Sequence, residues 1–346
     1  MKAKILILAG GCGTRLWPLS TDEKPKQFQS FFDDRTLLQM AYDRIGDSNP
    51  DDIYVSTNKR YKLLVKEQLP DVPFDNIIAE PSRRDTGPCI AFAMKYIKDQ
   101  SGGDSIVTII NADQLIKKPE KFRSVMNASQ KIADQSDQLV LVSVETKFPN
   151  PNLGYIKVGS KQQVTDGISV FQLDQFVEKP DLKSASKYHR AKNYYWNTAI
   201  FTWKIDTFLY YLKQYSDDIH TNLQMISDYK NCKDEYDSFP KISIDYALLE
   251  KMSPEKLAVI PADLGWSDVG TWKTMFDESP KDKYSNLVKG KFRYSNVKNS
   301  VLINETNNEA VAYNLENKFY IITKNTSIVG DLDDSNRLKN IVKTIS

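Results

Sequence analysis

Three glycines and an arginine follow the first apolar run of the chain. The segment reads ILILAGGCGTRLWPLS, with Gly10, Gly11 and Gly13 ahead of Arg15. A glycine-rich turn after a strand offers backbone N–H groups to an anion and lets the backbone approach closely. Arg15 adds a permanent charge that suits phosphate. The pattern indicates a phosphate-binding loop, and a simple strand-to-helix turn is the alternative for this loop taken alone.

Two better-known phosphate loops do not fit this segment. A Walker loop requires the spacing GxxxxGK[ST], and no lysine follows Gly13 in that register. A dinucleotide-binding fingerprint requires GxGxxG, but after Gly11 and Gly13 the third glycine position holds Leu16. The sequence therefore argues against both a P-loop NTPase and an NAD-linked dehydrogenase.

Two aspartates are the best metal-ligand candidates. Asp113 ends the apolar run SIVTIINAD, and Asp268 lies in the turn GWSDVG. The chain has three cysteines and two histidines, without a CxxC pair or a histidine pair at ligand spacing. Oxygen ligands favour a hard ion such as Mg²⁺. Either aspartate taken alone is also typical of a turn or a helix cap.

The order of apolar runs predicts an α/β fold that positions these residues. Short β-branched runs alternate with helical stretches up to about residue 150, which is typical of a mostly parallel sheet with helices on both faces. Ligands bind beyond the carboxyl ends of the strands in such sheets. We expect a main domain over residues 1–280. Residues 281–346 read as a small β-rich module resembling a β-helix and ending in a helix.

Composition excludes several classes of function. The 346 residues carry a net charge of +2 from 47 basic and 45 acidic side chains, which demands neither a nucleic acid nor a membrane surface as partner. No apolar run approaches the length of a bilayer span, and no signal-peptide pattern opens the chain. We expect a cytoplasmic protein. Cys12, Cys89 and Cys232 are expected to be small buried or loop residues.

The glycine loop continues into a longer signature. It extends as GGCGTRLWPLS followed by PKQF, and this string resembles that of the sugar-1-phosphate nucleotidylyltransferases, in the form found in mannose-1-phosphate guanylyltransferases. The segments AEPSRRDTGPCIAFA, NADQLI, FVEKPD, YYWNTAIFTWK, SIDYALLEK and DLGWSDVGTW follow in the order of that family. The resemblance implies a Rossmann-like, nucleotide-diphospho-sugar transferase fold. It also implies that GTP and mannose 1-phosphate react to GDP-mannose and pyrophosphate.

The resemblance assigns roles to residues on the nucleotide side. Lys26 would stabilise the charge that develops at the α-phosphate, and Asp113 and Asp268 would carry Mg²⁺. Lys24 lies outside the matching position and reads as a solvated lysine. The residues that would hold the nucleotide are Gly10, Gly11, Gly13, Thr14, Arg15, Glu80, Arg84, Asp85 and Thr86.

Glu80 gives a separate argument for guanine. A carboxylate can accept hydrogen bonds from both N1–H and N2–H₂ of guanine, whereas uracil and thymine offer one donor flanked by acceptors. The alternative is a structural glutamate that Arg83 or Arg84 neutralises.

On the sugar side, the resemblance implies that Glu178, Lys179 and Asn197 bind the hexose phosphate. It places Gly154 and Tyr155 in the strand that forms the base of this pocket.

Several positions depart from the family pattern. Asp85 replaces the usual asparagine, Gly87 stands where alanine is frequent, Asn111 replaces proline, and Gln114 replaces a histidine. None removes a group that the chemistry requires, but Gln114 could shift the nucleotide or sugar preference. The open alternatives are another hexose or heptose 1-phosphate, another nucleotide, or a silent nucleotide-sugar-binding homologue. A fused isomerase domain is not expected, and the tail could support a homodimer.

Overall fold

The computed structural model describes residues 3–11 and 13–345. These residues divide into two compact units, each formed by segments that are far apart in the sequence. Unit 1 comprises residues 1–10, 41–112 and 116–266, and unit 2 comprises residues 11–40, 113–115 and 267–346. Helix α1 (Leu37–Asp43) spans one of the points where the chain passes from one unit to the other.

Unit 1 is built on a large mixed sheet. Among the described residues it has nine strands in the order β3-β2-β1-β4-β9-β6-β10-β8-β7. The strands β1 to β4 pair in parallel, as do β6 and β10, whereas β9, β8 and β7 run antiparallel to their neighbours. Their bounds are β1 Ala3–Leu8, β2 Ile53–Asn58, β3 Ile77–Glu80, β4 Ile106–Asn111, β6 Leu139–Glu145, β7 Tyr155–Thr165, β8 Ile168–Val177, β9 Tyr194–Lys204 and β10 Leu257–Pro261.

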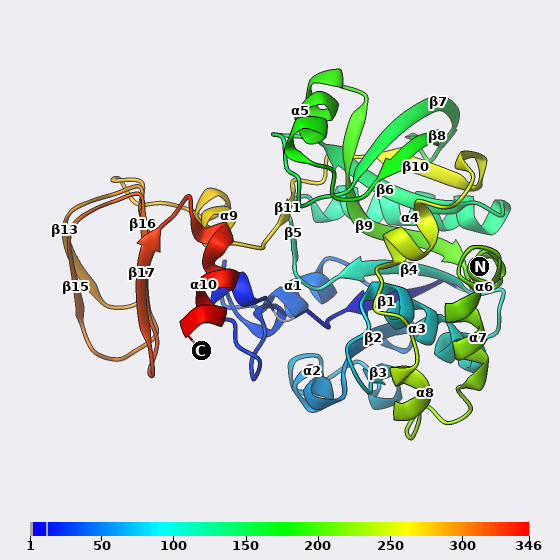
Figure 1. The fold of residues 1–346 in the computed structure, drawn as a ribbon, viewed down its shortest axis with the longest axis horizontal. Coiled ribbons are helices and arrows are strands. Elements are labelled where there is room, and N and C mark those ends of the chain that lie inside the picture. Colours follow the sequence, from blue (N-terminus) through cyan, green and yellow to red (C-terminus); the bar gives the residue numbers. More distant parts are fainter. Residues whose placement is uncertain (1–2, 12, 346) are drawn as a thin grey trace. The chain divides into compact units, whose positions relative to one another are not determined.

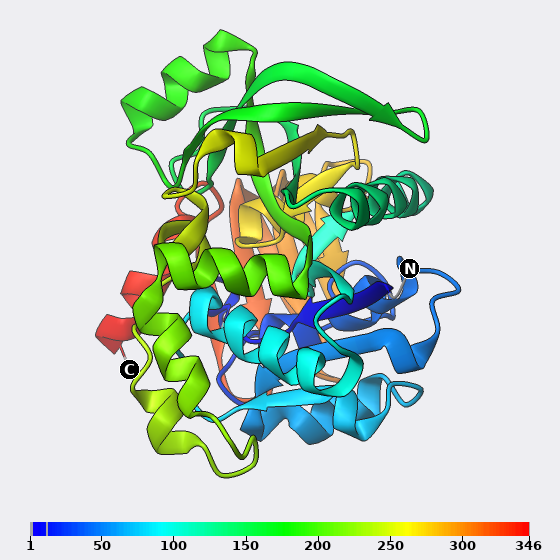
Figure 2. The ribbon, with the colours of Figure 1, turned by 90° about the vertical axis from the view of Figure 1, so that its right-hand side faces the viewer.

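Strand β9 joins two parts of this sheet. Its second half pairs with β4 and β6, and its first half pairs with β6 and β7. The register shifts at a bulge opposite Val142 and Ser143, which lets one strand serve both partners. The pairing with β7 closes the strands β9-β6-β10-β8-β7 on themselves. Figure 2 shows the long β7–β8 hairpin, with helix α5 (Leu182–Ala191) at one end of it.

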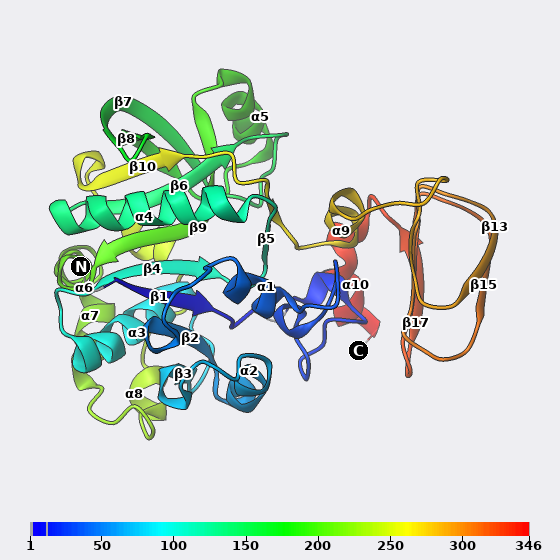
Figure 3. The ribbon, with the colours of Figure 1, turned by 180° about the vertical axis from the view of Figure 1, so that it is seen from behind.

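Helices cover both faces of the unit 1 sheet (Figures 1 and 3). Helix α4 packs on β4, β6 and β9, while α3, α6 and α7 pack on one another and on the other face. The large core of unit 1 lies under these three helices and includes Trp203, Phe201 and Phe92. The helix bounds are α2 Lys62–Gln68, α3 Thr86–Ser101, α4 Pro119–Gln135, α6 Ile205–Tyr215, α7 Asp217–Met225 and α8 Lys233–Asp237, and a π-helix spans Asp245–Leu249.

Unit 2 contains the tail and has a core of its own. In the tail, β12, β14 and β16 stack in parallel, β13 and β15 form a second parallel pair, and β17 closes the first sheet antiparallel to β16 (Figure 1). The same residue offset separates Phe292 from Ala310 and Val301 from Phe319, as expected for successive coils of a β-helix. The bounds are β12 Leu287–Lys289, β13 Phe292–Lys298, β14 Val301–Asn304, β15 Ala310–Glu316, β16 Lys318–Ile322 and β17 Ser327–Asp331, with helices α9 Trp272–Glu278 and α10 Leu338–Ile345.

The topology confirms the predicted fold class, a mixed α/β sheet with a small β-helix-like tail. The boundary predicted near residue 280 stays a prediction. Within residues 3–11 and 13–345, no helix is long and apolar enough to cross a membrane.

The turn at Gly290 offers a test of the tail. Gly290 has a φ of +82°, and a Cβ there would come within 2.0 Å of the Asn304 carbonyl oxygen. Gly167 has a φ of +77° with open space around it. Gly167→Ala should cost about 1 kcal/mol of unfolding free energy through backbone strain alone, and Gly290→Ala roughly 3 kcal/mol because the clash adds to that strain. Urea denaturation measures both, and equal losses would contradict the predicted clash.

Candidate active site

The predicted phosphate loop lies in unit 2 from Gly11 onward, while Gly10 belongs to unit 1, and Gly13 tightens the loop. This residue has a φ of 60°, and the Leu16 N–H donates to its carbonyl at 3.1 Å. A Cβ at position 13 would come within 2.7 Å of both the Lys26 Cγ and the Ser20 Oγ. Glycine therefore serves both the left-handed turn and the close approach of the loop to the lysine stem. Cys12 lies outside the described residues.

Lys26 is the most constrained side chain of this region. It opens a short 3₁₀ turn after Pro25, and its side chain is only 7% exposed. The ammonium donates to the Val269 carbonyl at 2.9 Å and lies 3.0 Å from the Asp113 Oδ2. A buried ammonium requires such a counter-charge. The Lys26 charge is thereby fixed at one place.

The two predicted metal ligands belong to one pair of short strands. Asp113 directly precedes β5 (Gln114–Ile116), Asp268 ends β11 (Trp266–Asp268), and these strands pair with each other. A Cβ at Gly270 would lie 3.1 Å from the Asp268 Oδ2 and 3.2 Å from an Arg15 guanidinium nitrogen. Unit 2 thus brings together Arg15, Lys26, Asp113 and Asp268.

The donor set suits a divalent cation only together with a ligand. Across the described residues, no three His, Cys, Asp or Glu side chains gather as a metal cage. Asp113 and Asp268 offer two carboxylates, and the Asp113 side chain is one-third exposed. Mg²⁺ is commonly held by one or two carboxylates, with substrate phosphates and waters as the other ligands. The residues present therefore fit a hard divalent cation that binds together with a phosphate-bearing ligand.

Glu80 ends β3 in unit 1 and is only 6% exposed. Its Oε2 accepts a hydrogen bond from the Tyr236 hydroxyl at 2.6 Å, and its Oε1 accepts one from the Ser56 hydroxyl at 3.4 Å. Burial raises the pKa of this carboxyl, against the opposing effect of the Tyr236 hydrogen bond. A Cβ at Gly10 would lie 3.6 Å from Oε1, so no side chain covers this oxygen from that position.

Helix α8 holds the segment that follows Glu80. Asp237 accepts hydrogen bonds from the Ser82 hydroxyl at 2.6 Å and from the Arg84 guanidinium at 3.0 Å. The neighbouring Tyr236 donates to Glu80. Arg84 is therefore the ion-pair partner of Asp237, which weakens the alternative in which it neutralises Glu80. The same short helix anchors two of the predicted nucleotide residues.

The fold accommodates Asp85 and requires a small residue at Gly87, two positions that depart from the family pattern. Asp85 caps helix α3, where its Oδ1 accepts from the Thr86 N–H at 2.7 Å, and aspartate and asparagine cap equally well. The Thr86 hydroxyl accepts from the Ile244 N–H at 3.0 Å. A Cβ at Gly87 would lie 2.7 Å from the Ile242 carbonyl oxygen, so alanine would require a shift here.

Asn111 and Gln114, the other two residues that depart from the family pattern, lie at the two ends of the turn after β4. The Asn111 amide donates to the Ala199 carbonyl at 3.0 Å, which ties the end of β4 to β9. Gln114 is buried at the start of β5, directly after Asp113. An influence of Gln114 on substrate preference stays a prediction.

Four predicted sugar residues lie together in unit 1. A Cβ at Gly154 would come within 2.4 Å of the Glu178 Oε2 and 3.2 Å of the Asn197 Cβ, and the Asn197 N–H donates to the Gly154 carbonyl at 2.8 Å. Glu178 forms an ion pair with Lys179. Tyr155 is fully buried beneath them, and its hydroxyl accepts from a backbone N–H at position 150.

Sequence reasoning missed three side chains that contact predicted site residues. Tyr236 and Asp237 hold the Glu80 segment, and Asp245 accepts a hydrogen bond from Asn197 at 2.9 Å. Asp245 did carry a signal, since it stands in the apolar run IDYALL, and a buried acid needs partners. Tyr236 and Asp237 stand in a polar stretch whose sequence does not mark them as functional residues.

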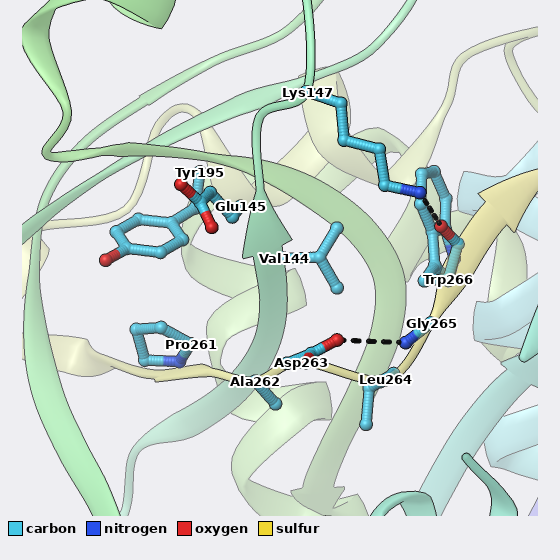
Figure 4. A pocket seen from close by; sticks show the side chains of 10 residues that line it. All are labelled: Val144, Glu145, Lys147, Tyr195, Pro261, Ala262, Asp263, Leu264, Gly265 and Trp266. Carbon is cyan, nitrogen blue, oxygen red and sulfur yellow. Dashed lines mark hydrogen bonds between the residues drawn. The ribbon is translucent and has the colours of Figure 1, made fainter. Parts of the chain in front are cut away.

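Unit 1 also contains a cavity of about 370 Å³ at the ends of β6 and β10 (Figure 4). Tyr195, which lines it, lies two residues before Asn197 on β9, and the Lys147 ammonium reaches the Trp266 carbonyl at 3.4 Å. Asp263 accepts from the Gly265 N–H at its rim. The lining residues are Val144, Glu145, Lys147, Tyr195, Pro261, Ala262, Asp263, Leu264, Gly265 and Trp266.

The Tyr236–Glu80 contact predicts a pH-dependent loss of stability. Tyr236→Phe removes a donor from a buried carboxyl group, which should cost about 2 kcal/mol while Glu80 is charged. Burial raises the pKa of Glu80 and the Tyr236 hydrogen bond opposes that rise, so the loss should shrink as the pH falls and Glu80 takes up a proton. Denaturant unfolding across a range of pH values measures it. Tyr96→Phe, which loses an exposed bond to a backbone carbonyl, is the control, and a pH-independent loss would contradict the assignment.

Comparison with known proteins places the chain in a family. The nucleotidyl transferase family matches residues 4–285. The chain is 32% identical to mannose-1-phosphate guanylyltransferase 2 of Escherichia coli O157:H7, over 98% of this chain and 73% of that protein. It is 31% identical to the alginate biosynthesis protein AlgA of Pseudomonas syringae pv. tomato, over 99% of this chain and 71% of that protein.

A solved structure supports the fold. The crystal structure described as mannose-1-phosphate geranyltransferase from Thermus thermophilus superimposes with a TM-score of 0.87 at 23% identity, over 100% of this chain and 99% of that one. Enzymes of the matched family generally use a divalent metal ion. On these matches, together with the loop, lysine and aspartates of unit 2, the chain belongs to the nucleotidyl transferase family.

Proposed function

We propose that this chain transfers GMP from GTP to α-D-mannose 1-phosphate, forming GDP-mannose and pyrophosphate. The observation that carries the proposal is the Lys26 ammonium, held between the Asp113 carboxylate and the Val269 carbonyl with a glycine loop against its stem. The names of the two curated relatives support the choice of substrates.

In the proposed reaction, a phosphate oxygen of the sugar phosphate attacks the α-phosphorus of GTP. The new P–O bond forms as the bond between the α-phosphorus and the bridging oxygen to the β-phosphate breaks, and pyrophosphate leaves with that electron pair. Such a transfer asks the protein mainly to position the reactants and to offset charge. The cationic and N–H groups of unit 2 suit that task.

The roles of the unit 2 residues follow from their contacts. Loop N–H groups around Gly11, Gly13 and Thr14, with the Arg15 guanidinium, hold the triphosphate. Lys26 offsets the charge that develops at the α-phosphate, and its ammonium needs no reorganisation because Asp113 and Val269 already hold it.

Mg²⁺ is the proposed metal, and Asp113 and Asp268 would hold it. When bound, it would neutralise phosphate charge and bring phosphate oxygens together. Because the chain offers two carboxylates and no larger cage among the described residues, the nucleotide phosphates would complete the ligand set.

Glu80 is the residue proposed to bind guanine. Its Oε2 accepts from Tyr236 and its Oε1 accepts from Ser56 at 3.4 Å, and glycine at position 10 places no side chain against Oε1. Carboxylate oxygens have lone pairs for further donors, so the N1–H and N2–H₂ of guanine can still be accepted. Arg84, Asp85 and Thr86 flank this position, with Arg84 fixed by Asp237.

Glu178, Lys179 and Asn197 are the proposed sugar-phosphate residues, over a floor of Gly154 and Tyr155. Lys179 supplies a cation for the phosphate, and the Glu178 and Asn197 side chains suit hydroxyl groups. A cytoplasmic location stays a prediction. So does a homodimer formed through the tail, where Val311 and Tyr313 are exposed on β15.

The substrate assignment predicts a defined preference. In a panel of GTP, ATP, UTP and dTTP against mannose, glucose and heptose 1-phosphates, GTP with mannose 1-phosphate should give the highest kcat/KM. Glu80→Gln should lower kcat/KM for GTP by about 100-fold, because the second acceptor for guanine is lost. Pyrophosphate release measures both. If UTP or dTTP matched GTP, the guanine argument would fail.

The charge and metal roles predict losses in kcat. Lys26→Met and Asp268→Asn should each reduce kcat by roughly 100-fold or more, while Lys24→Met, two residues from Lys26, should leave it unchanged. Chelation of divalent ions should abolish turnover, and added Mg²⁺ should restore it. Full activity of Asp268→Asn would remove the metal assignment.

A further inference from the structure

Asp245 lies in the predicted sugar cluster without an assigned role. It opens the π-helix Asp245–Leu249 and is 8% exposed. The Asn197 Nδ2 donates to its Oδ1 at 2.9 Å, and the Asn197 Oδ1 accepts from the Ala199 N–H at 3.0 Å. These two contacts fix which way the Asn197 amide faces. Asp245 therefore sets the orientation of a side chain proposed to bind sugar.

The charges around Asp245 are unbalanced. Glu178 and Lys179, at the end of β8, face it and form an ion pair with each other. Tyr246 lies on the same helix as Asp245, and Glu250 directly follows that helix. The Tyr246 hydroxyl donates to the Glu178 carbonyl, and Glu250 accepts from the Glu178 N–H at 2.8 Å. One ammonium thus serves two buried carboxyl groups. Burial, and then the neighbouring Glu178, raise the pKa of Asp245 to about 7.

We propose that Asp245 is a positioning residue of the sugar-phosphate site, which acts as a neutral acid that orients Asn197 and leaves Glu178 as the one buried negative charge there. The inference rests on the proposed function and adds a residue to the site. A neutral Asp245 still accepts from Asn197 through Oδ1, while its other oxygen holds the proton. An ionised Asp245 would put a second negative charge beside Glu178, where an anionic sugar phosphate has to bind.

The sign of the pH effect follows. The pKa of Asp245 is raised, so the neutral acid predominates below about pH 7 and is lost above it. Sugar phosphate should therefore bind more weakly as the pH rises through this range, and binding above pH 7 should take up a proton. Asp245→Asn keeps a neutral acceptor for Asn197 and removes the titration.

The test compares wild type, Asp245→Asn, Asp245→Ala and the control Asp206→Asn, which alters an exposed ion pair with Lys98. KM for mannose 1-phosphate is measured at saturating GTP and Mg²⁺ from pH 6 to 9. Relative to Asp245→Asn, wild type and the control should show KM rising by up to about tenfold per pH unit above pH 7, with kcat within about twofold.

Asp245→Ala should raise KM at every pH, because Asn197 loses its acceptor. The sugar phosphate's own titration affects all variants equally, and a shared pH profile of wild type and Asp245→Asn would overturn the proposal.

Calorimetry separates this inference from the proposed function. Binding of mannose 1-phosphate at pH 8, measured in buffers of different ionisation enthalpy, should show proton uptake by wild type beyond that of Asp245→Asn. Binding with this extra uptake but no turnover would overturn the proposed function alone. Turnover without a difference in uptake would overturn the role of Asp245 alone. Thermal melts verify folding. The stability of Asp245→Asn relative to wild type should rise as the pH rises from the usual range of an aspartate pKa to about 7, because only the unfolded wild-type chain releases the Asp245 proton there, and it should stay constant at higher pH.

Discussion

The need of a buried ammonium for a counter-charge organises unit 2. Lys26 satisfies that need with Asp113 and the Val269 carbonyl, which come from chain segments remote from it in sequence. The pairing of β5 with β11 brings those segments together. The chain leaves the unit 1 sheet just beyond β1 and β4, which are parallel neighbours, and the Ala112 N–H donates to the Leu8 carbonyl. The loop and the first aspartate thus follow adjacent strand ends, as expected for this class of sheet.

Two buried acids of unit 1, Glu80 and Asp245, have different neighbours. Burial raises the pKa of Glu80, and two hydroxyl donors, from Tyr236 and Ser56, oppose that rise by stabilising the carboxylate. Asp245 has one amide donor, and burial and then the neighbouring acid Glu178 raise its pKa to about 7. The two acids therefore differ in their neighbours, since hydroxyl donors surround Glu80 while a second acid lies beside Asp245. These neighbours support the proposed roles of Glu80 as an acceptor for guanine and of Asp245 as a neutral acid beside an anionic ligand.

Part of this arrangement could be predicted from the sequence. The alternation of apolar runs predicted the α/β class, and the resemblance of the glycine, lysine and aspartate motifs to a family pattern pointed to Arg15, Lys26, Asp113 and Asp268, which lie together in unit 2. The closure of β9 onto β7 and the bulge in β9 could not be predicted, since both depend on pairing between distant strands. The contacts of Tyr236 and Asp237 could not be predicted for the same reason. Their short helix has an ordinary polar sequence, and only the tertiary fold brings it to Glu80 and Arg84.

Three glycines, Gly154 in unit 1 and Gly13 and Gly270 in unit 2, leave little free space around charged side chains. A Cβ would meet the Lys26 stem at Gly13, the Glu178 carboxylate at Gly154, and the Asp268 and Arg15 side chains at Gly270. Only Gly13 of these three has a positive φ, so space alone explains the other two. A larger residue at Gly154 or Gly270 would displace a charged side chain rather than strain the backbone. Glycine at these positions therefore preserves the placement of charged side chains, and nucleotidyl transfer depends mainly on such placement.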